Sequence, residues 1–289
     1  MEFGENCVAC IFNKEMKKIE TYDPSRIEVY TQKVRQVLAE DHGTAPEYQF
    51  MIDELHCEYW GRASDMYTNA KREHTKLLLE EETKFDRMVS ESKNPLETAI
   101  KVAGAGNYID MAAMDQVEIP YLLSKMQSYI EYELDATTYQ NFYEDLKNAK
   151  GVIYLTDNCG EVVLDKILIK AIQTEFPNLS IQAIVKGMPV LNDVTREDAE
   201  LAGLTELVEV MDNGTAIAGT SLKRITEEAR KKLYQADVII SKGQGNFETL
   251  SGCGLNIYYL LLCKCEYFAT KLRRERMEMA FINEKEIGE

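Results

Sequence analysis

The pattern of apolar and polar positions divides the chain near residue 150. Before this point, apolar residues recur three and four positions apart among Glu, Lys and Arg, which predicts amphipathic α-helices. The segments with this pattern are Ser25–Glu40, Tyr48–Glu91, Leu96–Val102 and Ile119–Lys147. Asn94-Pro95 and Gly104–Asn107 interrupt the pattern, and we expect breaks between helices there.

Beyond residue 150, short apolar and β-branched runs alternate with helical segments. The runs predict buried strands at Val152–Leu155, Ile181–Val185, Leu207–Met211 and Val238–Ser241. Their spacing of roughly 25 to 30 residues suits parallel strands joined by right-handed helical crossovers. Ile257–Cys263 and Met277–Ile282 fit additional edge strands, although the first run also fits a buried helix. We therefore expect an α-helical domain over residues 1–148 and an α/β domain over residues 149–289.

The composition is that of an ordinary globular protein, with 289 residues of which 45% are hydrophobic and 28% charged. No run approaches the about 18 uncharged apolar residues of a membrane span, and MEFGENCVAC lacks the basic and apolar regions of a signal peptide. We expect a cytoplasmic protein. The seven cysteines, an odd number, favour free thiols or metal ligands over a disulfide framework.

The formal charge is −16, from 49 acidic and 33 basic residues. This charge opposes binding to nucleic acid and to anionic membranes. If the substrate is an anion, local lysines, backbone amides or a metal ion must overcome the field of the whole chain.

Polar side chains follow the first predicted strand. Asp157, Asn158 and Glu161 surround Gly160, where helical spacing begins, so they lie at a strand-to-helix turn. Open α/β sheets bind ligands just outside the carboxyl ends of their strands. A carboxylate beside a carboxamide offers oxygen ligands suited to Mg²⁺ or Mn²⁺. The same residues fit a helix N-cap equally well, so this stretch alone leaves both interpretations open.

A second polar turn follows Ile181–Val185. Asp193 lies there, and it could supply a third oxygen ligand beside Asp157 and Asn158. The alternative is a structural role, in which Asp193 or Thr195 caps the next helix with Asp198 in a capping box. The two turns taken together favour the metal.

A glycine-rich turn follows Val238–Ser241. Lys242, Gly243, Gln244, Gly245 and Asn246 offer a cation, close backbone approach and successive amides, which together predict a phosphate-binding turn. The spacing is not that of a Walker A loop, and a tight turn without a ligand is the plainer interpretation. Lys264, after a very apolar run, either extends to the surface or neutralises a bound phosphate.

The cysteines allow two further hypotheses. Cys7 and Cys10 form half of a zinc site at most, because no second Cys-x-x-Cys occurs. Cys159 lies inside the turn after the first strand, but all three histidines are in the first half of the chain, which disfavours Cys/His catalysis.

Four of these segments, in this order, resemble the motifs of the damage-control metal-dependent phosphatases, a family long described as a domain of unknown function. They are Asp157–Glu161, Val185–Thr195, Ser241–Glu248 and Lys264-Cys265. Cys7-x-x-Cys10 and the run Gly106–Asp110 also resemble the prokaryotic branch of that family. The resemblance extends from the N-terminus to about residue 268.

The resemblance implies a Rossmann-like three-layer α/β/α domain with a mainly parallel sheet, preceded by an α-helical domain. It also implies a divalent cation, Mg²⁺, Mn²⁺, Co²⁺ or Ni²⁺, at Asp157, Asn158 and Asp193, and a phosphate bound by Lys242–Asn246 and Lys264. The implied reaction is hydrolysis of phosphate monoesters of small metabolites, sugar phosphates or damaged phosphometabolites. Glu161, Asn107 and Asp110 are expected first as residues that orient these groups.

Two other classes of function remain open from the sequence. One is a methyltransferase that uses S-adenosylmethionine, although the turn at Asp157–Gly160 is a poor version of its glycine-rich loop. The other is a non-catalytic scaffold that binds a metabolite or zinc. The sequence leaves the leaving group, the native metal, the oligomeric state and the role of Cys7 and Cys10 undetermined.

Overall fold

We describe a computed structural model of the chain, which covers residues 5–61, 67–108, 124, 127–128 and 130–287. The N-terminal half of this part is helical, as the periodicity predicts. Its helices are α1 (Glu5–Ile19), α2 (Pro24–Ala39), α3 (Ala45–Trp60), α4 (Thr68–Ser90), α5 (Pro95–Gly106) and α8 (Ala136–Asn148). No helix in the described ranges is long and apolar enough to cross a membrane.

The second half contains a sheet with six strands in the described residues, in the order β3-β2-β1-β4-β5-β6. The strands are β1 (Gly151–Leu155), β2 (Ser180–Val185), β3 (Glu209–Asp212), β4 (Val238–Lys242), β5 (Ile257–Leu262) and β6 (Met279–Asn283). All neighbours are parallel except β5 and β6, which are antiparallel. The four predicted strands are confirmed, and the ambiguous run after residue 256 is strand β5 rather than a helix.

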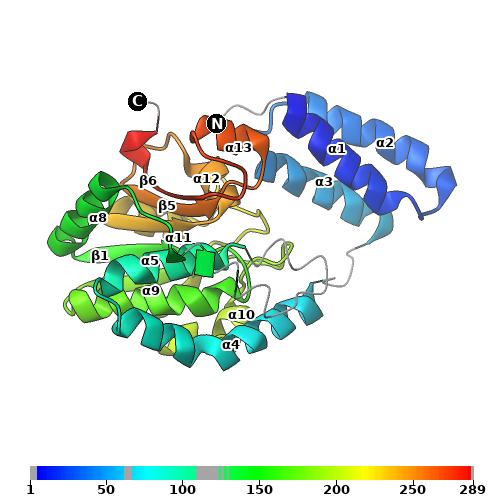
Figure 1. Cartoon of the computed structure of the whole chain (residues 1–289). Coiled ribbons are helices and arrows are strands. Elements are labelled where there is room, and N and C mark those ends of the chain that lie inside the picture. Colours follow the sequence, from blue (N-terminus) through cyan, green and yellow to red (C-terminus); the bar gives the residue numbers. More distant parts are fainter. Residues whose placement is uncertain (1–4, 62–66, 109–123, 125–126, 129, 288–289) are drawn as a thin grey trace.

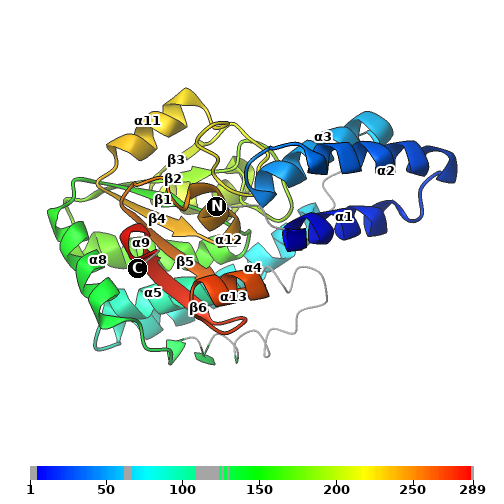
Figure 2. The same ribbon diagram turned by 90° about the horizontal axis from the view of Figure 1, so that it is seen from above.

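Helices cover both faces of this sheet and give three layers (Figures 1 and 2). One face carries α5, α8 and α9 (Glu161–Glu175), with α4 packed against α9 and α10 (Arg196–Leu201) beside it. The other face carries α11 (Glu227–Gln235), α12 (Gln244–Leu250) and α13 (Glu266–Lys271). Short 3₁₀ turns follow at Leu204–Glu206 and Glu284–Glu286. The strand order reverses between β1 and β4, the position where doubly wound sheets bind ligands.

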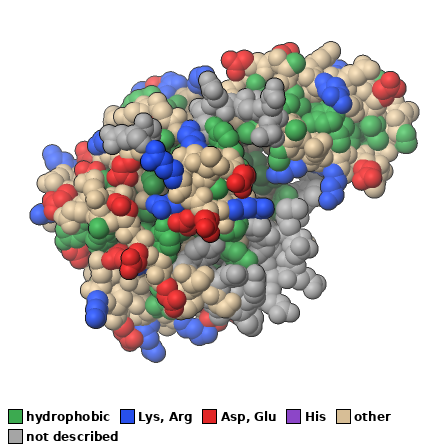
Figure 3. Space-filling model, turned by 45° about the horizontal axis from the view of Figure 1, so that its top comes forward, with side chains coloured by type: hydrophobic (Ala, Val, Ile, Leu, Met, Phe, Trp, Pro, Cys, Tyr) green, Lys and Arg blue, Asp and Glu red, His purple; other side chains and the backbone are tan. Residues whose placement is uncertain are grey.

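Helices α1, α2 and α3 form a separate group with its own apolar core around Tyr30 and Ile52 (Figures 1 and 2). We call these three helices the N-terminal arm. In the view of Figure 3, the molecular surface is hollowed between this arm and the rest of the molecule. The Ser221 hydroxyl donates a hydrogen bond of 2.6 Å to Glu47 at the start of α3. This bond ties the arm to a loop that follows β3.

The buried core does not follow the predicted division at residue 148. Leu78 of α4, Ile100 of α5 and Phe142 of α8 belong to the same apolar cluster as the sheet residues Tyr154 and Ile240. A helical domain that ends at residue 148 stays a prediction, but three of its helices share the core of the α/β unit.

The break predicted at Gly104–Asn107 falls at the end of that stretch, because α5 continues to Gly106 and Asn107 is its C-cap. A Cβ atom on Gly104 would lie 2.3 Å from Met279 Sδ, and one on Gly106 would lie 3.1 Å from Glu161 Cγ. The two glycines therefore let α5 approach β6 and α9 closely. The helix predicted over Ile119–Lys147 is interrupted: residues 124, 127–128 and 130 are helical, residues 132–135 are not, and α8 begins at Ala136. Residues 119–123, 125–126 and 129 lie outside the described ranges.

Candidate active site at the carboxyl edge of the sheet

The turn after β1 buries three polar side chains. Asp157, Asn158 and Glu161 are 8%, 2% and 0% exposed. The Asn158 amide nitrogen donates to Asp157 Oδ2 at 2.7 Å and to Glu161 Oε2 at 2.8 Å. The N-cap of α9 is Gly160, with φ of +80° and no side-chain capping bond. Asp157 and Asn158 are therefore not helix caps, which removes the structural alternative for this turn.

The turn after β2 joins the first turn through the backbone. Asn158 and Asp193 form an antiparallel bridge, and Val194 N donates to Asp157 O at 2.8 Å. Asp193 is 3% exposed. Thr195 caps α10 in a capping box with Asp198, at 3.0 and 2.7 Å. The capping role thus belongs to Thr195, and Asp193 is left at the edge shared with Asp157 and Asn158.

Asn107, at the end of α5, reaches this edge from the helical half, as predicted. Its amide nitrogen donates to Asp157 Oδ2 at 2.9 Å and to both Glu161 oxygens at 3.1 and 3.3 Å. Its carbonyl oxygen accepts from Leu262 N at 3.1 Å. Asn107 therefore links the acidic turn to the end of β5. Asp110 lies outside the described residues.

Lys242 does not lie where a phosphate-binding residue is expected. Its ammonium is 0% exposed and donates to Glu161 Oε1 at 2.6 Å, Asp165 Oδ1 at 2.6 Å and Ala103 O at 2.8 Å. These three acceptors match the three N–H groups of an ammonium. Burial raises the pKa of Asp165 to about 6, although the charge of Lys242 opposes the shift. The structure corrects the prediction that Lys242 contacts phosphate, because the Lys242 side chain lies between α5 and α9.

The glycine-rich turn after β4 packs directly on the acidic turn. Gly243 has φ of +77°, and a Cβ atom there would lie 1.9 Å from Asp157 Oδ2. Helix α12 begins at Gln244, so Gln244, Gly245 and Asn246 form its first turn. Asn246 is 0% exposed, and its amide nitrogen donates to Thr156 O at 3.0 Å and Lys242 O at 2.8 Å. Asn246 thus fixes the ends of β1 and β4 relative to each other.

Lys264 lies two residues beyond β5 and is partly exposed. Leu262, the last residue of β5, is bonded to Asn107, so the backbone leading to Lys264 starts beside the acidic turn.

Two features of this edge escaped the sequence analysis. Lys186, directly after β2, is 3% exposed and lies 3.3 Å from Asn246 Oδ1 and 3.5 Å from Asp193 Oδ2. The loop after β3 also packs here, since the Thr220 hydroxyl donates to Asn246 Oδ1 at 2.8 Å. Lys186 could have been found from the sequence, because it belongs to the same turn after a predicted strand as Asp193. The sequence offered no comparable signal for Thr220.

The cysteines do not supply a nucleophile or a metal centre here. Cys159 is 1% exposed, and burial raises the pKa of its thiol well above the ordinary value, so the thiolate is disfavoured. Cys7 and Cys10 lie one turn apart on α1, with Cys10 exposed. Within the described ranges, no three His, Cys, Asp or Glu side chains group as a metal site.

The donor set at the sheet edge fits a hard divalent cation. Asp157 and Asp193 offer carboxylate oxygens, and the hydrogen bonds from the Asn158 amide nitrogen fix its orientation, which leaves the carbonyl oxygen as its ligand atom. Oxygen-only sets of this kind suit Mg²⁺ and Mn²⁺. A cation held here would take its third oxygen from Asn158, a residue type outside the His, Cys, Asp and Glu groups.

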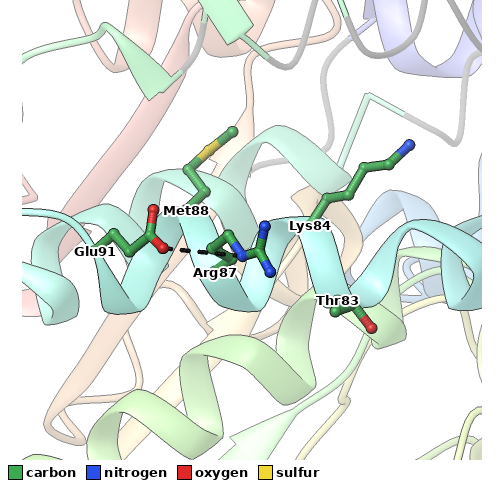
Figure 4. Close-up of a pocket in the computed structure, with 5 residues that line it drawn as sticks. All are labelled: Thr83, Lys84, Arg87, Met88 and Glu91. Atoms are coloured by element: carbon green, nitrogen blue, oxygen red, sulfur yellow. Dashed lines mark ion pairs between the residues drawn. The ribbon is translucent and has the colours of Figure 1, made fainter.

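A cavity of about 340 Å³ lies elsewhere, on the surface of α4 (Figure 4). Thr83, Lys84, Arg87, Met88 and Glu91 line it, and Arg87 pairs with Glu91 at 3.9 Å. None of the predicted site residues lines this cavity.

The fold and the site define a doubly wound α/β protein with an acidic, oxygen-rich turn and a glycine-rich turn at its topological switch point. The chain belongs to the family described as the damage-control phosphatase ARMT1-like domain, whose model matches residues 4–279.

Solved and curated relatives agree with this assignment. The crystal structure of a DUF89 family protein from Pyrococcus horikoshii superposes with a TM-score of 0.82 at 28% identity, over 98% of this chain and 99% of that one. The damage-control phosphatase PH1575 of Pyrococcus horikoshii is 38% identical over 182 residues, 63% of this chain and 62% of that protein. The alignment thus spans less than two thirds of that relative. A damage-control phosphatase of Archaeoglobus fulgidus is 27% identical over 274 residues, 92% of this chain and 93% of that protein.

Proposed function

We propose that the protein is a metal-dependent phosphatase that hydrolyses phosphate monoesters of small metabolites, with sugar phosphates and damaged phosphometabolites as the substrate classes. The observation that carries the proposal is the backbone bridge between Asn158 and Asp193, which unites the acidic residues of two neighbouring strand ends. Membership of the family and relatives named damage-control phosphatase support the same class.

In this proposal Asp157, Asn158 and Asp193 hold the divalent cation, Mg²⁺, Mn²⁺, Co²⁺ or Ni²⁺. When bound, the cation supplies Lewis-acid polarisation of a phosphoryl oxygen and lowers the pKa of a coordinated water. The remaining work belongs to the side chains and amides of the chain itself.

Glu161 acts as a positioning residue. It is 0% exposed and accepts hydrogen bonds from Lys242, Asn107 and Asn158. These donors satisfy both carboxylate oxygens, which favours orientation of Asn158 and Asp157 over proton transfer. Surrounding groups of this kind tune the ligands of a metal.

The phosphate would lie against the backbone amides of Gln244–Asn246 in the first turn of α12, with Lys264 as a further cation. The amide of Gly243, expected here from the sequence, already donates to Leu260 O at 3.1 Å. Gly243 leaves space for the Asp157 carboxylate, so the two turns stay in contact. Preorganised N–H groups and cations stabilise the charge that develops on a transferring phosphoryl group. The reaction breaks the bond between phosphorus and the leaving oxygen and forms one to the oxygen of water.

The experiment is a screen of phosphorylated metabolites with Mg²⁺, Mn²⁺, Co²⁺ and Ni²⁺, each with and without a chelator. We expect phosphate release that the chelator abolishes and the cation restores. The decisive variant is Asp157→Asn, which should lower kcat/KM at least about 100-fold for every responsive substrate.

The matched control is Asp212→Asn. Asp212 also ends a strand, but it is exposed and accepts a hydrogen bond from Gly214 N at 2.9 Å. Its kcat/KM should stay within about threefold of the unmodified protein, as for other surface substitutions. Full activity of Asp157→Asn, or release that is indifferent to chelator, would disprove the metal mechanism.

A further inference from the structure

Lys186 carries an inference beyond the proposed function. It directly follows β2 and is held in the turn that contains Asp193, because its backbone nitrogen donates to Val194 O at 2.9 Å and it forms a bridge with Thr195. Its side chain is 3% exposed. A buried ammonium is costly unless its hydrogens find acceptors, so the partners of this group are informative.

The contacts of Lys186 are longer than those of Lys166 and Lys242, two other lysines buried in the same unit. Lys242 has three acceptors within 2.8 Å, and Lys166 has Glu82 at 3.0 Å and Ala202 O at 2.6 Å. The structure gives Lys186 only two neighbouring acceptors within the described residues, and neither is closer than 3.3 Å. An ammonium has three N–H donors. Lys186 therefore keeps donor capacity for an anionic oxygen.

The position of this ammonium fits a phosphoryl group. One neighbour, Asp193, belongs to the candidate cation site, and the other, Asn246, belongs to the first turn of α12. Asn246 is itself fixed to Thr156 O and Lys242 O, at the ends of β1 and β4. The Lys186 ammonium thus lies between Asp193, one of the residues that would hold a cation, and the turn that would hold a phosphate.

We propose that Lys186, and not Lys242, is the lysine that contacts the phosphoryl group and stabilises its charge in the transition state. This inference rests on the proposed phosphatase function. As the bond from phosphorus to the leaving oxygen breaks and the bond to water forms, negative charge develops on oxygens within reach of Lys186. The leaving oxygen and the phosphate product share the two protons of the attacking water.

The experiment compares Lys186→Met and Lys186→Gln with the matched control Lys166→Met, another buried lysine, which bonds to α4 and to the end of α10. Two readouts are taken: kcat/KM on an ester from the screen, and binding of inorganic phosphate in the presence of Mn²⁺ by calorimetry. We expect both Lys186 variants to lose about 100- to 1000-fold in kcat/KM, the usual cost of losing one charge-stabilising donor. The affinity of both Lys186 variants for phosphate should fall at least about tenfold. For Lys166→Met, kcat/KM and phosphate affinity should both stay within about threefold of the unmodified protein.

A third measurement separates contact with phosphate from simple neutralisation of Asp193. If Lys186 only balances that carboxylate, its removal should strengthen Mn²⁺ binding and leave phosphate binding unchanged, and the inference is overturned. Lys186→Gln keeps a polar group at the position, so it decides the question if Lys186→Met fails to fold.

The failure of this inference is distinguishable from failure of the proposed function. If the unmodified protein hydrolyses esters and both Lys186 variants retain kcat/KM within about threefold, the function stands and the inference is wrong. If the unmodified protein hydrolyses no ester, the proposed function is wrong. The inference about Lys186 is then tested by comparing phosphate binding of the unmodified protein and the Lys186 variants. Loss of that binding in the Lys186 variants supports an anion site, while unchanged or undetectable binding overturns it.

Discussion

The Lys242 ammonium lies 2.6 Å from Glu161 Oε1, and both side chains are completely buried. Glu161 in turn accepts hydrogen bonds from Asn107 and Asn158, which also donate to Asp157. Lys242, which points away from the site, is thereby linked to the candidate metal-binding carboxylate of Asp157 through three successive hydrogen bonds, by way of Glu161 and either asparagine. The position of Asp157 depends on charges in the core.

Replacing Lys242 by methionine should strongly destabilise the fold. The change would leave the carboxylates of Glu161 and Asp165 buried without their cation, which typically costs about 3–5 kcal/mol. The measurement is the free energy of unfolding in denaturant at neutral pH. The exposed Lys231→Met serves as control and should change that free energy by less than about 0.5 kcal/mol. A loss below about 1 kcal/mol for Lys242→Met would contradict the burial of a paired ammonium.

Replacing Gly243 by alanine should lower kcat/KM by about 100-fold. Its Cβ would lie 1.9 Å from Asp157 Oδ2, so the carboxylate must move, and displacements of this size cost about 100-fold in rate. The control is Gly252→Ala, because Gly252 also has a positive φ, +90°, but nothing lies within 4 Å of the added atom. Both variants should lose about 1–2 kcal/mol of stability from the left-handed backbone. Equal activity of the two would show that the contact with Asp157 is unimportant.

Glu248 should make stability depend on pH. Burial raises its pKa to about 7 from an ordinary value of 4.5, although a hydrogen bond from Gln244 and the charge of Lys14 oppose the shift. The folded protein therefore binds the proton more tightly than the unfolded chain does. This contribution is complete below about pH 4.5 and is lost as the pH rises through about 7.

The check is the free energy of unfolding between pH 5 and pH 8 for the unmodified protein and Glu248→Gln. The difference between them should grow in favour of the variant as the pH rises, because glutamine has no charge to bury. Two parallel curves would mean that the carboxyl titrates normally in the folded protein.

Cys159 should be inert in the native protein. Its thiol is buried and its pKa is raised well above the ordinary value, whereas Cys10 is exposed. Brief treatment with iodoacetamide at neutral pH, followed by peptide mass spectrometry, should show alkylation of Cys10 and none of Cys159. Denatured protein, in which both react, is the control for peptide recovery. Early alkylation of Cys159 together with loss of activity would contradict this prediction and support a catalytic role for the Cys159 thiol.

The metal-ligand candidates could be predicted from the sequence because their position depends on strand order alone. Asp157 and Asp193 follow strands that pair in parallel, so their turns meet at one edge. The assignment of Lys242 failed because it depends on which face each side chain takes. Lys242 shares its face with Val238 and Ile240, which pack under α5 and α9, while Lys186 shares the face of Ile184, where α12 lies. Which of the two lysines faces the site becomes clear only when it is known which helices cover each face of the sheet.

The glycines of α5 place the predicted helix break two to three residues too early, for a related reason. Gly104 and Gly106 fit a helix break by local propensity, but their lack of side chains serves contacts with β6 and α9. The course of the loop that carries Thr220 and Ser221 was likewise hidden, since its partners Asn246 and Glu47 are far away in the sequence. Tertiary contacts decided both cases.

The packing of Gly104 against Met279 also sets an order of events during synthesis. Helix α5 is made well before strands β5 and β6, which cover part of its apolar face. Pairings this distant in sequence form slowly and leave apolar surface exposed in the meantime. Helix α9 can cover one side of α5 early, but the side that packs on β5 and β6 stays without its partner until the last strands of the sheet are available.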